Sequence, residues 1–217
     1  DLVETFRWSQ AAALVAMMRA TMAHLSGRLT EAEAHNRTAT ERLMSSGAFD
    51  AAGIGLLALL TLRVTDHRVA ELVDVLGQID TTADALIADL RALPLLALGR
   101  RDDAARGRHD LPPVPYNFFR SLVLTFRGMV ASALADPIEA ARVEPELRSY
   151  RGQVGGGGTG SFVVGPVDTV LGDLALTLGR PDEALEWWRG ALTLAERCGN
   201  GWWAADIRRR LGDPARG

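Results

Sequence analysis

The stretch Gly165–Glu196 reads GPVDTVLGDLALTLGRPDEALEWWRGALTLAE, and its pattern predicts the fold. Two runs of helix-spaced apolar residues flank the phrase LGRPDEA at Leu178–Ala184. Gly179 can adopt the left-handed conformation that closes a helix. Pro181 suits the first turn of the next helix, because its missing N–H has no partner to lose there. Glu183 then lies near the positive end of the helix dipole. The stretch therefore predicts two helices joined by a tight elbow.

The elbow phrase recurs along the chain. Leu25–Ala32 reads LSGRLTEA, Leu98–Ala104 reads LGRRDDA, and weaker copies begin at Thr65 and Leu134. Self-similarity at a period of roughly 30–45 residues is typical of helical solenoids. We therefore predict an all-α fold, a right-handed α-solenoid of about five helical hairpins plus a terminal helix. The predicted units are at about 1–47, 48–80, 81–113, 114–150 and 165–200, with a capping helix at 201–212 and a flexible Gly-rich connector at 151–164.

Composition excludes several classes of function. All 24 basic residues among the 217 are arginine, so a P-loop lysine and a Schiff-base lysine are absent. The net charge of −3 gives no electrostatic footprint for direct nucleic-acid binding. The longest apolar run, Ala51–Leu62, is shorter than the ~20 residues that cross a bilayer, so we predict no membrane association. The single Cys198 suits a reducing compartment and predicts a cytoplasmic location.

The last unit resembles the tetratricopeptide repeat family. The small and aromatic positions that carry the resemblance are Leu171, Gly172, Gly179, Ala184, Trp188 and Ala191. The resemblance implies a superhelix in which the first helix of each hairpin lines a concave groove. Carried over position by position, it assigns a set of groove-binding residues: Met17, Thr21, His24, Leu57, Thr61, Asp89, Thr125, Met129, Thr169 and Asp173. Such an apolar groove, without a basic residue, suits an amphipathic helix or a small apolar ligand.

A more specific resemblance covers most of the chain. It is carried by GRLTEAEAHNRTA at Gly27–Ala39, by Arg68–Leu72 and by the stretch from Gly165 quoted above. These segments are similar to the C-terminal helical-repeat region of large actinobacterial transcriptional activators and signalling ATPases. The resemblance implies a fragment of a longer regulator, in keeping with the missing initiator Met. It also implies a non-catalytic module that binds a protein partner, the upstream domains of its own polypeptide or a small-molecule effector, with no cofactor.

Other chemistry finds less support in the residues. GGGGTG at Gly155–Gly160 satisfies G-x-G-x-x-G, but no βαβ pattern surrounds it, so we interpret it as a connector. Glu31 and His35 are spaced as two metal ligands, but no second pair accompanies them, and we predict no metal site. We predict no catalytic residue. The alternative is a stand-alone small-molecule-binding protein, or an enzyme that uses His24 and Asp173 in the groove.

Two adjacent tryptophan pairs stand near the end of the chain. Neighbouring helical residues point ~100° apart, so both members of a pair cannot enter one core seam. Trp188 falls on the packing position of the repeat. Trp187, together with Trp202 or Trp203, is then predicted to form an exposed aromatic interface for a protein partner or for a homodimer. The alternative is that the following helix covers Trp187.

Overall fold

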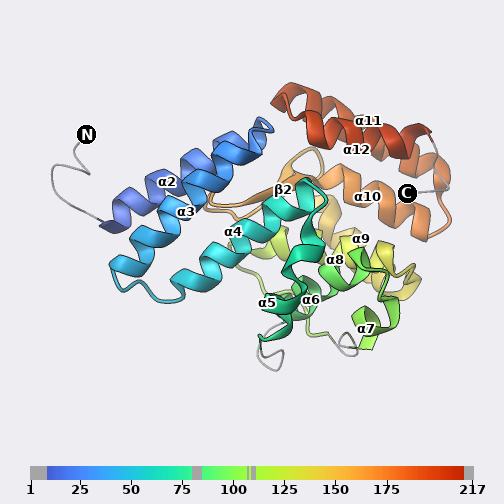
Figure 1. Ribbon diagram of the computed structural model, residues 1–217. Coiled ribbons are helices and arrows are strands. Elements are labelled where there is room, and N and C mark those ends of the chain that lie inside the picture. The colour runs from blue at the N-terminus through green and yellow to red at the C-terminus, as the bar shows by residue number, and fades with distance from the viewer. Residues whose placement is uncertain (1–8, 80–84, 107, 109–110, 213–217) are drawn as a thin grey trace.

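The computed structural model describes residues 9–79, 85–106, 108 and 111–212, so the start of the first predicted unit and parts of the second and third lie outside the described residues. The described chain is mostly helical, as the sequence predicts (Figure 1). Its elements are, in order, α2 (Ser9–Leu25), α3 (Leu29–Ser45), α4 (Ala51–Thr65), η1 (Val69–Leu72), α5 (Val73–Gly77), α6 (Ala85–Ala97), α7 (Arg101–Arg106), α8 (Arg120–Ala133), α9 (Pro137–Leu147), η2 (Arg148–Tyr150), β1 (Val154–Gly156), β2 (Val163–Pro166), α10 (Val167–Thr177), α11 (Pro181–Cys198) and α12 (Gly201–Gly212).

The elbows between paired helices have one geometry. In each of the five elbow phrases one residue has positive φ, and these residues are Gly27, His67, Gly99, Ala135 and Gly179. At each, the next residue donates its N–H to a carbonyl five residues back, for example from Arg180 N to Ala175 O at 2.9 Å. This bond satisfies a carbonyl that the helix end would leave unpaired. The repeated phrase therefore marks a repeated local structure, even where glycine is replaced.

The paired helices differ in length along the chain. α2 and α3 are long and lie side by side, as do α10 and α11 (Figure 1). In the second unit the segment after the elbow is a 3₁₀ turn followed by the short α5, and in the third unit α7 has only six residues. The middle of the chain thus keeps the elbows but shortens the second helices. Among the described residues, no helix combines the length and apolar character needed to span a membrane.

The Gly-rich segment forms a β-hairpin, which corrects the prediction of a flexible connector. β1 and β2 pair antiparallel, with Gly155 opposite Gly165 and an irregularity after Gly155. A Cβ on Gly155 would lie 2.5 Å from Thr125 Oγ1, and one on Gly156 would lie 2.1 Å from Phe162 O. Glycine is therefore required by close packing at these two positions.

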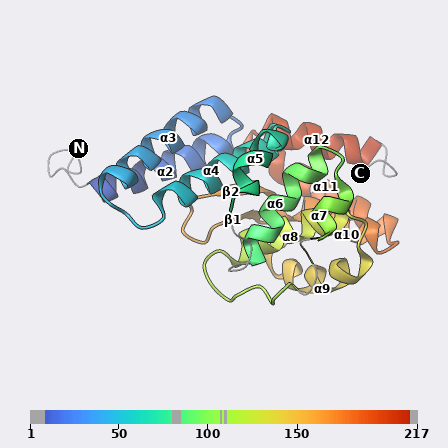
Figure 2. The same ribbon diagram turned by 60° about the horizontal axis from the view of Figure 1, so that its bottom comes forward.

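The hairpin fills the side of the molecule where the first helices of the units converge. Phe162 and Val164 are buried in one core cluster with Met17 of α2, Leu57 of α4 and Phe126 of α8. Figure 2 shows both strands lying between the helices of the first two units and those of the last three. The predicted open groove is thus occupied here by the chain itself.

The C-terminal helix meets the N-terminal helices. Asn200, before α12, donates through Nδ2 to the carbonyl of His24 at 2.8 Å. Trp203 Nε1 donates to Thr65 Oγ1, at the end of α4, at 3.3 Å. In an open solenoid each repeat contacts only its neighbours. This chain departs from that pattern, because its first and last units are in direct contact.

Candidate functional site

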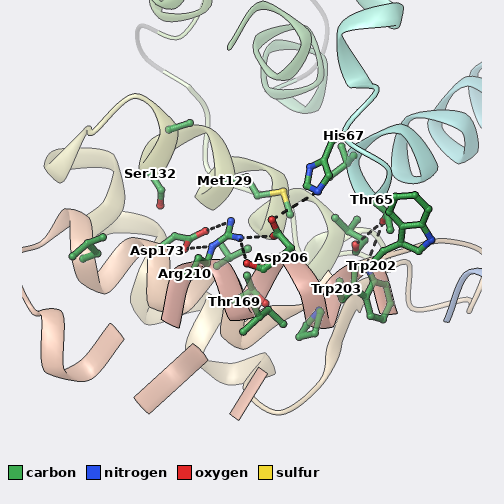
Figure 3. Close-up of a pocket in the computed structure, with 18 of the residues that line it drawn as sticks. Thr65, His67, Met129, Ser132, Thr169, Asp173, Trp202, Trp203, Asp206 and Arg210 are labelled. Carbon is green, nitrogen blue, oxygen red and sulfur yellow. Dashed lines mark hydrogen bonds and ion pairs between the residues drawn. The ribbon is translucent and has the colours of Figure 1, made fainter. Parts of the chain in front are cut away.

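A cavity of about 310 Å³ lies where α4, α8, β2, α10 and α12 meet (Figure 3). Its lining combines apolar side chains with a cluster of charged ones. Its lining residues are Val64, Thr65, His67, Met129, Ser132, Ala133, Val164, Gly165, Pro166, Thr169, Val170, Asp173, Leu176, Thr177, Trp202, Trp203, Asp206, Ile207 and Arg210. The walls therefore come from early, middle and late parts of the chain.

Arg210 of α12 organises the polar side of the cavity. It donates to both carboxylate oxygens of Asp173 on α10, from Nε at 2.8 Å and from Nη2 at 3.1 Å. Its Nη1 bonds to Asp206, one turn earlier on α12. Figure 3 shows Arg210 between the two carboxylates. Trp188 Nε1 adds a third donor to Asp173, at 3.0 Å.

These contacts set the charge state of the cluster. Burial raises the pKa of Asp173, and the donors Arg210 and Trp188 oppose that effect. Burial also disfavours the charged form of Arg210, but Asp173 and Asp206 outweigh it and raise the pKa of the guanidinium. Arg210 is consequently a permanent cation held by two acids.

Asp206 has further partners at the edge of the cavity. Arg209 Nη2 donates to its Oδ1 at 2.6 Å, and His67 Nε2 lies 3.8 Å from that same oxygen. Arg209 Nη2 also lies 3.1 Å from His67 Nε2. The elbow after α4 and the last turns of α12 are therefore joined by polar contacts beside the cavity.

Two hydroxyl groups in the lining have no hydrogen-bond partner within the described chain. They are Ser132 Oγ on α8 and Thr169 Oγ1 on α10, and both atoms are buried. Thr177, also in the lining, differs because its hydroxyl donates to the carbonyl of Asp173 at 2.9 Å. Buried hydroxyls are usually paired, so Ser132 and Thr169 are unusual in having hydroxyl groups that make no hydrogen bond within this part of the protein.

The structure divides the predicted groove residues into two groups. Met129, Thr169 and Asp173 line the cavity. The other seven are buried in the interior and do not face an open groove, and they are Met17, Thr21, His24, Leu57, Thr61, Asp89 and Thr125. The physical reason is that the β-hairpin and the contact between the first and last units cover the surface that a groove would need.

His24 and Asp173 are not brought together. His24 Nε2 lies 2.8 Å from Thr65 Oγ1, and desolvation by burial lowers its pKa to about 4. Asp89 also has its own partners, an ion pair with Arg108 and one with Arg127 at 3.2 Å. Within the described residues, neither His24 nor Asp89 is a member of the cavity cluster.

The predicted interface tryptophans differ in exposure. Trp202 lines the cavity and keeps 45% of its surface exposed, whereas Trp203 is only 5% exposed and packs in the core. The prediction names Trp202 or Trp203, and Trp202 is the exposed one of the two. Trp187 is partly buried, with its Nε1 3.3 Å from Glu183 Oε1 and the Arg148 guanidinium 5.5 Å from its ring centre.

Arg210, Asp206 and Ser132 did not emerge as site residues from the sequence. Asp206 and Arg210 have the i,i+4 spacing of a helical ion pair, and that spacing can be read from the sequence. Their approach to Asp173 depends on where α12 docks, and local spacing does not give that.

Among the described residues, no group of three or more His, Cys, Asp or Glu side chains is arranged to hold a metal ion. Comparison with protein-family models, with curated proteins and with solved structures gave no match.

Proposed function

We propose that this chain is a non-catalytic, effector-sensing and protein-interaction module of a cytoplasmic bacterial transcriptional regulator or signalling ATPase. One observation carries the sensing role: the cavity is built jointly by α4, α8, α10 and α12. A molecule bound there contacts both the first units and the last. The sequence resemblance supports the assignment to a regulator with upstream domains.

The proposed mechanism is a change in how firmly the two ends of the chain hold together. A ligand shifts a conformational equilibrium by the difference between its affinities for the two states. The cavity exists only when α12 lies against α4, so an occupant binds the closed arrangement and stabilises it. Upstream domains or a protein partner that contact either end would then sense whether the effector is bound.

The test is to recover the effector from a small-molecule extract of actinobacterial cells. The chain is incubated with the extract, separated by gel filtration, and its retained compounds are identified by mass spectrometry. The matched control is Ala133→Trp, because Ala133 is exposed at the cavity and a large side chain there would obstruct it. We expect a compound that the unmodified chain retains chemically unchanged and that Ala133→Trp loses. Retention of nothing, equal retention by both chains, or conversion of the compound contradicts the proposal.

A further inference from the structure

We infer that the cavity binds a small uncharged molecule with an aromatic body and at least one hydroxyl or carbonyl group. This inference deepens the proposed function and rests on it, since it names the chemical class of the effector at the same cavity. Three features of the lining carry it: paired charges, unpaired hydroxyls and an aromatic wall.

The charged side chains of the lining are already neutralised by one another. Each of the three nitrogen atoms of Arg210 donates to Asp173 or Asp206. Asp173 accepts from Trp188 as well, and Asp206 accepts from Arg209. A carboxylate or phosphate ligand would have to displace an acid from Arg210, and an ammonium ligand would have to displace a guanidinium. Either charge would lose its hydration without gaining a free partner, so the cavity disfavours ions.

The lining groups that lack a hydrogen-bond partner are uncharged. Ser132 Oγ and Thr169 Oγ1 are buried and have no partner among the described residues. A hydroxyl can donate one hydrogen bond and accept two. Both oxygens have almost no solvent-accessible surface, so a ligand hydroxyl or carbonyl pairs with them once each side chain rotates about χ1 towards the cavity; leaving such groups unpaired in the interior is unfavourable. These two side chains therefore select an uncharged hydrogen-bonding group.

The remaining wall is apolar and aromatic. Met129, Val170 and Ile207 line it together with the indoles of Trp202 and Trp203. Trp202 is the exposed member, so an occupant would cover part of its ring and gain aromatic contact. The volume of about 310 Å³ is at the lower end of the roughly 300–1,000 Å³ typical of ligand pockets. The occupant is accordingly a compact molecule.

The test uses three naphthalene probes of matched size, measured by isothermal titration calorimetry. They are 2-naphthalenemethanol, which is neutral, 2-naphthoate, which is an anion, and 2-naphthylmethylammonium, which is a cation. We expect the alcohol to bind at least tenfold more tightly than either ion. Equal or tighter binding of an ion, or no binding of the alcohol at millimolar concentration, overturns the inference.

Variants test the two hydroxyls directly. Thr169→Val and Ser132→Ala should each weaken binding of the alcohol three- to tenfold. Thr193→Val is the control, because Thr193 lies outside the cavity lining and its hydroxyl donates to the Arg189 carbonyl of its own helix. We expect this control to bind the alcohol as the unmodified chain does. Unchanged binding by both hydroxyl variants, or an equal loss in Thr193→Val, contradicts the inference. Thr169→Ala gives a second test of the same hydroxyl should Thr169→Val not fold.

The two proposals fail in different ways. If a compound from the extract is retained by the unmodified chain and lost by Ala133→Trp, but the alcohol does not bind, the ligand class is wrong and the sensing role stands. If the alcohol binds with the expected preference and no compound is retained from the extract, the cavity chemistry stands and the sensing role is wrong.

Discussion

His24 is an imidazole whose surroundings keep it neutral. It is 3% exposed, lies 2.8 Å from the Thr65 hydroxyl and packs against the Trp203 ring at a centroid distance of 5.8 Å. Desolvation lowers its pKa to about 4. The unfolded chain, with an ordinary histidine pKa, therefore binds more protons than the folded chain between about pH 6.5 and pH 4.

A pH dependence of stability follows from His24. The contribution of neutral His24 to the free energy of unfolding is fully present above about pH 6.5 and is lost as the pH falls towards 4. The loss between pH 7.5 and pH 5 is about 2 kcal/mol. Urea unfolding of the unmodified chain and of His24→Gln at both pH values measures it. We expect His24→Gln to lose about 2 kcal/mol less than the unmodified chain over this interval. Equal losses in both chains would contradict the assignment to His24.

Gly172 is fixed by the ring of Trp188. A Cβ at position 172 would lie 2.3 Å from Trp188 Nε1 and 2.4 Å from its Cδ1, and that indole is completely buried. An alanine inside a helix normally stabilises it relative to glycine by up to about 1 kcal/mol. Here we expect Gly172→Ala to destabilise the chain by about 1–3 kcal/mol, because overpacking outweighs helix propensity. The matched control is Gly201→Ala, since a Cβ at position 201 meets nothing within 4 Å. A Gly172→Ala chain as stable as the control would contradict the packing argument.

Elbow geometry at single residues could be predicted from the sequence. His67 and Ala135 have φ values of 59° and 51°, a conformation that favours glycine, and only the surrounding phrase marked them as turns. The phrase succeeds because a helix end is determined by residues within one or two turns of it. Site residues such as Arg210 depend on contacts with distant residues, for example Asp173, and a local pattern does not contain them.

At the scale of elements, the β-hairpin is the feature for which the Gly-rich composition gives the wrong prediction. A run of glycines is typical of a flexible linker, and the same run is required where two chain segments approach closely. What distinguishes the cases here is Thr125 on α8, which meets Gly155 across the fold. Because Thr125 is 30 positions away in the sequence, the distinction could not be made from the segment itself.

Close packing of the hairpin on α8 is testable by a double-mutant cycle. Gly155→Ala alone places a methyl group 2.5 Å from Thr125 Oγ1, and we expect it to cost about 1–3 kcal/mol. Thr125→Ala removes that oxygen, so the double variant should be more stable than the sum of the two single losses by roughly 0.5–3 kcal/mol. Chemical unfolding of the four chains gives the coupling. Strict additivity would show that Gly155 and Thr125 do not meet.

The elbow alanines set the distance between paired helices. Ala32 of α3 and Ala184 of α11 are completely buried. A leucine at either position must separate the two helices of its pair, and we expect a loss of about 1–3 kcal/mol for Ala32→Leu and for Ala184→Leu. Ala205→Leu on the exposed side of α12 is the control and should change stability little. Unchanged melting temperatures for both elbow variants would mean that the repeat alignment is wrong.

On the scale of the whole molecule, the repeat pattern predicts helical hairpins, but it does not predict how the last helix comes back to contact the first ones. The overall path depends on a small rotation at every step between units, and the short α5 and α7 change those steps in the middle of the chain. The result is that α12 returns to α2 and α4, and the cavity exists because of that return. A cavity of this kind is a property of the complete fold, so a single repeat gives no sign of it.

Asn200 joins the two ends of the chain and provides the sharpest test of closure. Its Nδ2 donates to the His24 carbonyl at 2.8 Å, while its Oδ1 accepts from Trp203 N at 3.1 Å and so caps α12. Asn200→Ser keeps a good capping hydroxyl but is too short to reach His24. It leaves that buried carbonyl unpaired, which we expect to cost about 1–3 kcal/mol.

Loss of the hydrogen bond between Asn200 and His24 should destabilise both ends of the chain. Hydrogen exchange followed by mass spectrometry should show faster exchange in α2 and in α12 together, although they are separated by most of the sequence. Thr193→Ala is the control, because Thr193 is exposed on α11 and its hydroxyl bonds to the Arg189 carbonyl of the same helix. In an open solenoid, damage at position 200 would spread mainly to the neighbouring unit. Faster exchange in α12 with no change in α2 would therefore show that the ends are independent, and that an occupant of the cavity has no closed state to stabilise.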